Sequence, residues 1–322
     1  MRIGVTLGDP SGIGPEIIAA ALAAGGGADV IVYGDRRILD EAAAKLGVAP
    51  PTSINEVTKL GAWTPGRPSA SSGRAQLEYL EAAVADARAG KLDALVTAPI
   101  HKASAIAAGF AFPGHTEFLQ ERFAVERVTM MFAGPRLKVS LATIHLALAD
   151  VPRALDVASL AGTIVQTARA LAHDFAIAAP RVAVAALNPH AGESGHFGDE
   201  ESRVLIPAIE RARAELAGAL PGAAITGPHV PDAVFRDALA DAAGGARHDA
   251  VVAMYHDQGL IPVKLADFEE AVNVTLGLPI VRTSPDHGVA HDLAGQGRAR
   301  STSFAAALRL ARQIVAHRAR KK

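Results

Sequence analysis

Short apolar runs alternate with longer segments of helical periodicity along most of the chain. The apolar runs, many of them rich in β-branched residues, predict buried strands at 2–7, 28–33, 93–98, 128–132, 137–143, 181–187, 250–253, 271–276 and 280–283. Apolar positions at helical spacing predict helices at 16–22, 37–46, 74–89, 152–172, 199–216, 232–242 and 302–317. Strands that alternate with helices are typical of an α/β fold.

The segments between these elements carry turn-forming residues. Residues 48–73 are rich in proline, glycine and serine, which predicts a long connection or an irregular hairpin, and Ser72 is the expected cap of the helix at 74–89. Gly134 and Pro135 predict the turn of a hairpin, and residues 227–235 a loop that leads into the next helix. We find no internal repeat and no linker, so we expect residues 1–322 to form one catalytic unit without separable sequential domains.

Composition narrows the class of protein. The formal net charge of −1 gives no broad basic field for nucleic acid, and the basic run at 317–322 is expected to be solvated. The absence of cysteine excludes disulfides, thiolate metal ligands and a cysteine nucleophile, so a transition-metal site would use histidines and carboxylates. No apolar run is long enough to span a membrane and the N-terminus has no signal-peptide pattern, so we expect a cytoplasmic protein.

Ionisable residues follow several of the predicted strands. The segment MYHDQGLIPVK, residues 254–264, comes directly after the strand at 250–253, and His145 and His190 follow two other strands. Ligands collect at the carboxyl ends of strands in open α/β folds, and three histidines with an open fourth position are a catalytic metal pattern. The alternative is that each histidine only bonds a loop carbonyl, because their spacing matches no local metal motif. The residues alone leave both interpretations open.

Two further segments suggest anion chemistry. GDPSGIGPE, residues 8–16, links a strand to a helix, but it lacks the third glycine of a dinucleotide fingerprint and the lysine of a P-loop. A tight turn supported by Asp9 is the alternative. PGHTE, residues 113–117, opens a helix, and the free N–H groups of a helix start suit an anionic group.

Seven segments occur in a specific order: GDPSGIGPE, TAPIHK, PGHTE, NPHAGE, YHDQGLIPVK, VNVTLGLPIVRTS and DHGVAHDLAGQG. Together they resemble the 4-hydroxythreonine-4-phosphate dehydrogenase (PdxA) family of vitamin B6 biosynthesis over residues 4 to about 303. The resemblance implies an isocitrate/isopropylmalate dehydrogenase-like α/β fold with two interwoven lobes and a central cleft. It also implies a homodimer with sites at the subunit interface.

The resemblance implies roles for individual residues. A divalent metal, Zn, Mg, Mn or Co, would be held by His145, His190 and His256, one of them reaching across from the partner subunit. Substrate-binding positions are His115, Thr116, Lys264, Asn273 and Arg282. The NAD- or NADP-binding loop contributes Asp286, His287, Gly288, Asp292, Gly295 and Gly297. His291 stands in that loop where we expect an aliphatic residue, and Val230 and Ala233 in GPHVPDAVF replace smaller or hydroxylated residues.

The implied reaction is NAD(P)-dependent oxidation of 4-phosphooxy-L-threonine, followed by decarboxylation to 3-amino-2-oxopropyl phosphate. Asp257 and Lys264 are the candidates for proton transfer. A related enzyme acting on threonate or erythronate phosphate, or on a diol, is the nearest alternative, and a substrate panel would separate these. A metal-dependent aldolase or hydrolase, or a non-catalytic binding module, would show no NAD-linked absorbance change.

Overall fold

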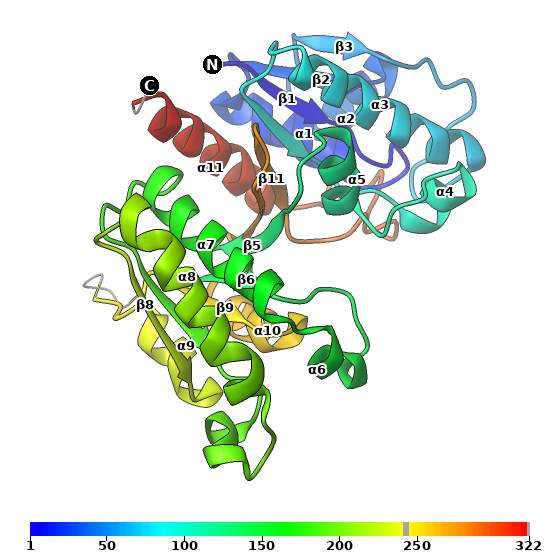
Figure 1. The fold of residues 1–322 in the computed structure, drawn as a ribbon. Helices are drawn as coiled ribbons and strands as arrows, with labels where there is room; N and C mark the ends of the chain where they lie inside the picture. The colour runs from blue at the N-terminus through cyan, green and yellow to red at the C-terminus, as the bar shows by residue number, and fades with distance from the viewer. Residues whose placement is uncertain (241–244, 321–322) are drawn as a thin grey trace. The chain divides into compact units, whose positions relative to one another are not determined.

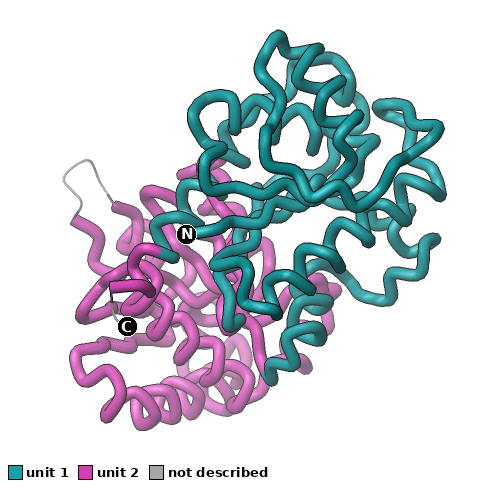
Figure 2. Tube along the Cα trace, turned by 90° about the horizontal axis from the view of Figure 1, so that it is seen from above, with its two compact units in different colours: residues 1–126, 278–315 teal, residues 127–277, 316–322 magenta. Residues whose placement is uncertain are grey.

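The structure is a computed structural model that describes residues 1–240 and 245–320. The chain forms two compact units, each assembled from segments that are not contiguous in the sequence (Figure 2). Unit 1 consists of residues 1–126 and 278–315, and unit 2 of residues 127–277 with the C-terminal end from Ala316. Distant parts of the sequence therefore share one hydrophobic core in each unit.

Unit 1 is built on a parallel sheet. In spatial order its strands are β3 (Ile54–Glu56), β2 (Val30–Gly34), β1 (Ile3–Thr6), β4 (Ala94–Thr97) and β11 (Val281–Pro285). All of these neighbours pair in parallel. Every residue of β1 and β4 is buried, as expected for parallel strands that helices cover on both faces.

The helices of unit 1 connect its strands (Figure 1). They are α1 (Gly14–Ala21), which continues into the π-helical turn η1 (Leu22–Gly26), α2 (Arg36–Leu46), α3 (Ala70–Arg88), α4 (Lys102–Ala107), α5 (His115–Arg122) and α11 (Thr302–Ala319). The long helix α3 packs on β1 and β2. The alternation of strands and helices that the sequence predicts is therefore present in unit 1.

Two predictions for unit 1 need correction. The connection at 48–73 contains β3, which pairs in parallel with β2 and so extends the sheet instead of forming a hairpin. The cap of α3 is Ser69, not Ser72: the Ser69 hydroxyl accepts from the Ser72 N–H at 3.1 Å, and the Ser72 hydroxyl accepts from the Ser69 N–H at 2.9 Å. Both serines thus belong to one capping box, which starts the helix four residues earlier than predicted.

Unit 2 is built on a mixed sheet. In spatial order its strands are β10 (Val272–Leu276), β5 (Thr129–Ala133), β6 (Lys138–Leu141), β9 (Ala250–Ala253), β7 (Arg181–Ala185) and β8 (Ala224–His229). The strand β5 is antiparallel to β10 and β6, which confirms the predicted hairpin at Gly134 and Pro135. The remaining neighbours are parallel.

Helices cover both faces of this sheet. They are η2 (Leu148–Asp150), α6 (Val151–Ala154), α7 (Val157–His173), η3 (Pro189–Gly195), η4 (Glu201–Leu205), α8 (Ile206–Ala219), α9 (Pro231–Ala238) and α10 (His256–Asp267). Side chains of a strand alternate between its faces, so Val139 of β6 joins the core cluster that includes Val263 of α10, while Ser140 points the other way. There the hydroxyl of Thr167 in α7 donates to the Ser140 hydroxyl at 2.8 Å.

Three predictions for unit 2 need correction. The helix expected at 152–172 is divided into α6 and α7, because Asp156 caps a new helix start. The predicted loop at 227–235 is instead the end of β8, up to His229, and the start of α9, from Pro231. Helix α9 ends at Ala238, and the last two residues of the predicted helix, 241–242, lie outside the described residues. The C-terminal basic run is not simply solvated, since Arg318 forms an ion pair at 2.7 Å with the buried carboxylate of Asp174.

Within the described ranges, no helix is both long and apolar enough to cross a membrane.

The cap of α7 yields a testable prediction. The Asp156 carboxylate accepts from the Ser159 N–H at 2.9 Å, and its hydrogen bonding to Ser159 holds the pKa of Asp156 below the ordinary value of 3.8. Asp156→Ala should destabilise the protein by about 1 kcal/mol at pH 7, measured by urea denaturation. Because the folded pKa is depressed, this stabilisation is present above pH 3.8 and is lost as the pH falls through the folded pKa, so the difference should shrink at pH 3.

Asp156→Asn is the matched control, because asparagine keeps an accepting oxygen without the charge. It should retain most of the stability at pH 7. Equal stability of the wild type and the alanine variant at pH 7 would contradict the cap.

Candidate functional site

A buried positive charge lies in unit 1. Strand β11 places the guanidinium of Arg282 in the interior, where it is 3% exposed and donates to the Thr97 hydroxyl at 2.8 Å. Burial lowers the pKa of Arg282 to about 10, partly offset by the negative charge of Glu117. The group is still charged at neutral pH, and burying a charge costs free energy unless an opposite charge compensates it. An anionic ligand would add to the negative charge of Glu117 in stabilising it.

The first turn of α5 adds further hydrogen-bonding groups, from His115 and Thr116. Thr116 is buried, and the Nε2 atom of His115 is buried without a hydrogen-bond partner in the part of the chain that the structure describes. Burial, followed by the positive charges of Arg282 and Lys102, holds the pKa of His115 well below 6.5. His115 is therefore a neutral donor or acceptor in a positive environment, and the free N–H groups of the helix start favour an anion. We use the name anion pocket for these three residues, His115, Thr116 and Arg282.

The three histidines predicted to bind metal all lie in unit 2, in the segments that follow neighbouring strands. His145 follows β6, His256 follows β9 and His190 follows β7. These strands are parallel neighbours in the order β6-β9-β7, so their carboxyl ends lie at the same edge of the sheet. The sheet therefore directs all three segments to one edge, as the sequence suggests.

Two of the three imidazole rings are in contact with each other. The centroids of His145 and His256 are 5.8 Å apart, whereas the ring of His190 contacts Phe197 at 6.2 Å between centroids. Among the described residues, the one group of three histidine or carboxylate ligand atoms within 4.8 Å of one another lies elsewhere, in unit 1. The metal role of these histidines stays a prediction.

The backbone around two of these histidines is unusual. His145 and His190 have φ angles of 40° and 53°, and the residues from His190 to Ser194 all have positive φ. Non-glycine residues in this region cost free energy and cluster at functional sites. His256 is oriented by a side chain, because its Nδ1 lies 2.7 Å from the Asp257 carboxylate.

The other predicted residues of unit 2 are Lys264 and Asn273. Lys264 lies two turns along α10 from His256, with its ammonium 5.4 Å from the centre of the Phe268 ring. Asn273 is in β10, and its side-chain oxygen is buried without a hydrogen-bond partner among the described residues. A buried unpaired amide oxygen costs free energy that a ligand donor would recover.

Residues 286–297, which we call loop 286–297, connect β11 to α11 and contain the six residues predicted to bind NAD(P). The carboxylate of Glu16, itself 3% exposed, accepts from the N–H groups of Gly295 and Gly297. The Nε2 atom of His287 is buried and lacks a hydrogen-bond partner within the described ranges. The loop is thus fixed at its glycine end.

A pocket of about 250 Å³ adjoins the loop at Gly295. Its walls include Glu16, Lys45 and Trp63, and the indole N–H of Trp63 donates to the Pro10 carbonyl at 2.7 Å. Ligand pockets for drug-sized molecules are usually about 300–1,000 Å³, so this pocket is slightly smaller than that range.

Some residues of the site were not identified as such from the sequence. Glu16 and Trp63 carry no local signal, because their contacts join segments far apart in the chain. Lys102 follows a strand in the segment TAPIHK, and that position is its one sequence signal as a site residue. Its positive charge lowers the pKa of His115. His101, in the same segment, and Asp9 contact loop 286–297 through His291.

Comparison with known proteins shows which proteins the chain is similar to. The sequence profile of the family described as "Pyridoxal phosphate biosynthetic protein PdxA" matches residues 27–311. The chain is 48% identical over 332 aligned residues to the 4-hydroxythreonine-4-phosphate dehydrogenase of Desulfosudis oleivorans, covering 96% of this chain and 94% of that protein.

Solved structures agree as well. The crystal structure of 4-hydroxythreonine-4-phosphate dehydrogenase from Klebsiella pneumoniae superimposes with a TM-score of 0.83 at 37% identity, covering 98% of this chain and 99% of that one. Isocitrate dehydrogenase from Methylococcus capsulatus, at 16% identity, 99% and 87% coverage and a TM-score of 0.51, shares the fold alone. The predicted isocitrate dehydrogenase-like α/β fold is confirmed.

The charge state of His115 can be measured directly. In a protein labelled with ¹⁵N-histidine, the ring signals of His115 should keep the shifts of a neutral imidazole at pH 6, because burial and nearby positive charges lower its pKa. The signals are assigned by their loss in His115→Gln. A midpoint at or above 6.5 would contradict the pocket as described.

Proposed function

Because the chain belongs to the PdxA family of pyridoxal phosphate biosynthetic proteins, we propose that it oxidises 4-phosphooxy-L-threonine with NAD(P). The resulting β-keto acid then loses carbon dioxide to give 3-amino-2-oxopropyl phosphate. The observation that carries the substrate class is the anion pocket, where the buried charge of Arg282 lies with the neutral ring of His115. A phosphorylated substrate suits this pocket.

The anion pocket would bind the phosphate of the substrate. Arg282 supplies a fixed positive charge, and the Thr116 hydroxyl and the first N–H groups of α5 supply donors. The uncharged ring of His115 can donate one hydrogen bond without needing a proton from solution. Phosphate binding here requires no change in the protonation of His115, which suits a phosphate dianion at neutral pH.

The histidines of unit 2 would hold a divalent metal, Zn, Mg, Mn or Co. Three neighbouring parallel strands end at one edge with His145, His190 and His256, and the family resemblance places one of the three ligands in the partner subunit. The contact between Asp257 and Nδ1 of His256 favours the tautomer whose Nε2 can bind metal. When bound, such an ion supplies positive charge that lowers the pKa of the substrate hydroxyl and stabilises negative charge on that oxygen.

Loop 286–297 would hold NAD(P), which accepts the hydride when it is bound. Glu16 keeps the glycine end of this loop in place, and Trp63 and Lys45 offer an aromatic surface and a positive charge in the adjoining pocket. The unpaired Nε2 of His287 is a further group in the loop that a ligand could satisfy. Asp286, Gly288 and Asp292 remain proposed contacts on the basis of the resemblance.

We propose different roles for Asp257 and Lys264. The Asp257 carboxylate contacts His256, so we assign it to positioning that ring. Lys264 remains the candidate for proton transfer and for contact with a substrate oxygen, alongside the amide oxygen of Asn273. The proposal includes a homodimer with sites at the subunit interface and a cytoplasmic location, as the resemblance implies.

The proposal predicts NAD(P) reduction. Purified protein with 4-phosphooxy-L-threonine and NAD or NADP should show rising absorbance of the reduced nicotinamide. A panel containing threonate phosphate, erythronate phosphate and a diol is the control for substrate class. Turnover of a panel member at a higher kcat/KM would overturn the assignment of the substrate, and no absorbance change with any of them would overturn the dehydrogenase.

Metal dependence is tested separately. Treatment with a chelator should abolish turnover, and Zn, Mg, Mn or Co should restore it. His256→Ala should lose most of its turnover because one ligand and the ring oriented by Asp257 are removed. His173→Ala, an exposed histidine at the end of α7, is the matched control. Full activity of the stripped enzyme would exclude the metal role.

Arg282→Gln tests the anion pocket. Loss of a hydrogen bond to a charged group costs about 1.5–3 kcal/mol, so kcat/KM should fall roughly 10- to 100-fold. Arg88→Gln, at the exposed end of α3, should change nothing. Circular dichroism and a thermal melt establish that the variant is folded. Wild-type kcat/KM in a folded Arg282→Gln would remove Arg282 from the site.

A further inference from the structure

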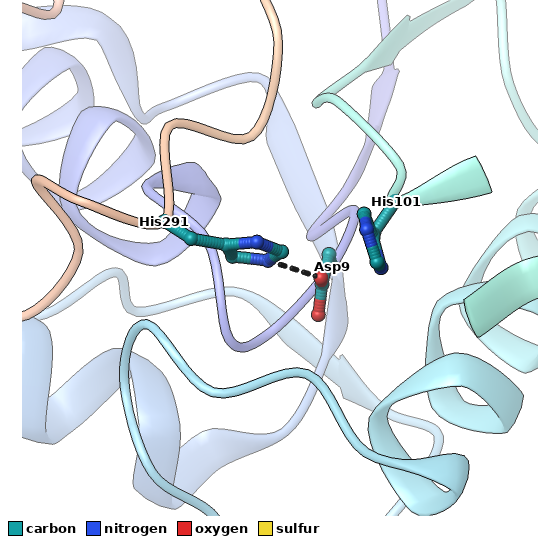
Figure 3. A group of neighbouring side chains, drawn as sticks. All are labelled: Asp9, His101 and His291. Atoms are coloured by element: carbon teal, nitrogen blue, oxygen red, sulfur yellow. Dashed lines mark hydrogen bonds and ion pairs between the residues drawn. The ribbon is translucent and has the colours of Figure 1, made fainter. Parts of the chain in front are cut away.

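A second cluster of possible metal ligands lies in unit 1. One ligand atom each from Asp9, His101 and His291 lies within 4.8 Å of the others, and the two imidazole rings flank the Asp9 carboxylate (Figure 3). Asp9 belongs to the turn after β1, His101 to the segment between β4 and α4, and His291 to loop 286–297. Three distant segments thus converge on one point.

Close backbone packing fixes the three segments. Gly8 has a φ of +69°, and a Cβ there would clash with the carbonyl oxygen of Pro99, two residues before His101. A Cβ on Gly12 would lie 2.8 Å from the Val289 carbonyl oxygen, two residues before His291. The turn that carries Asp9 also donates its Asp9 N–H to Pro99 at 2.9 Å. Main-chain packing therefore fixes the segments that carry the three ligand side chains.

Asp9 is the centre of the cluster. It is fully buried, its Oδ1 accepts from the Ser11 N–H at 2.9 Å, and its Oδ2 lies 2.9 Å from Nε2 of His291. A buried carboxylate is stabilised by a nearby positive charge or by metal coordination. Adjacent ligands around an octahedral ion with bonds of about 2.1 Å are about 3.0 Å apart, so the same spacing suits a shared cation.

The hydrogen bonds of His101 leave one ring nitrogen suited to a metal. The Ser104 hydroxyl donates its hydrogen to the His101 carbonyl at 3.1 Å and lies 3.0 Å from Nδ1 of the His101 ring. With the hydroxyl hydrogen on the carbonyl, Nδ1 carries its own hydrogen and donates in the second contact. Nε2 of His101 then keeps its lone pair. A second partner that fixes the tautomer in this way is typical of metal-binding histidines.

We propose that Asp9, His101 and His291 form a second divalent-cation site, separate from the one assigned to the histidines of unit 2. Two imidazoles and one carboxylate suit a transition-metal ion such as Zn²⁺, Co²⁺, Mn²⁺ or Fe²⁺ and leave coordination positions open. The site would join loop 286–297 to the turn after β1.

Metal binding without turnover tests the proposal, which keeps it independent of the proposed reaction. The full chain carrying His145→Ala and His256→Ala lacks two ligands of the other site. Equilibrium dialysis with Co²⁺ should still find about one ion per chain, with visible absorption bands of coordinated Co²⁺. Adding His291→Leu should weaken this binding at least roughly 100-fold and remove the bands, since one of three ligands is lost.

His173→Leu in the same background is the matched control and should leave Co²⁺ binding unchanged, because this exposed residue lies in α7. Asp9→Asn provides a second, isosteric variant if the leucine variant does not fold, which a thermal melt decides, and it should also weaken binding. Absence of Co²⁺ from the His145→Ala/His256→Ala protein would overturn the proposal. So would unchanged binding after His291→Leu or Asp9→Asn in a folded protein.

Discussion

Parallel strand pairing is the constraint on which the arrangement of functional groups depends. Parallel neighbours point their carboxyl ends to the same edge of a sheet, so any side chain that follows such a strand is directed toward that edge. In unit 2 this edge receives His145, His190 and His256 from three adjacent strands. In unit 1, β1 and β4 are likewise parallel neighbours, and they deliver Asp9 and His101. In both groups, the order of the strands in the sheet brings the residues together, and not their order along the sequence.

The two units carry different chemistry. The described part of unit 1 contains the buried guanidinium of Arg282 with the neutral ring of His115, loop 286–297 and the pocket beside it. Unit 2 contains the three histidines of the proposed metal site together with Lys264 and Asn273. Both units draw on segments from distant parts of the sequence, which is why no boundary between sequential domains can be found in the composition.

The sequence predicts elements well where burial alone decides them. Apolar runs identified the strands around Val251 and Val182 because both faces of these strands are covered. Ser69 and Ser72 were harder to tell apart, since either residue type can cap a helix, and β3 is too short and too exposed to leave an apolar signal. The pairing of His291 with Asp9 joins residues 282 positions apart, so only the folded chain reveals it.

The contact between Glu16 and the glycine end of loop 286–297 has a consequence for the energetics of ligand binding. A loop without periodic structure would normally lose conformational entropy when a ligand orders it, at about 1–2 kcal/mol for each backbone residue that becomes fixed. Here the N–H groups of Gly295 and Gly297 already donate to a buried carboxylate. Part of the ordering is thus completed during folding, and more of the interaction energy with the proposed dinucleotide would contribute to its affinity.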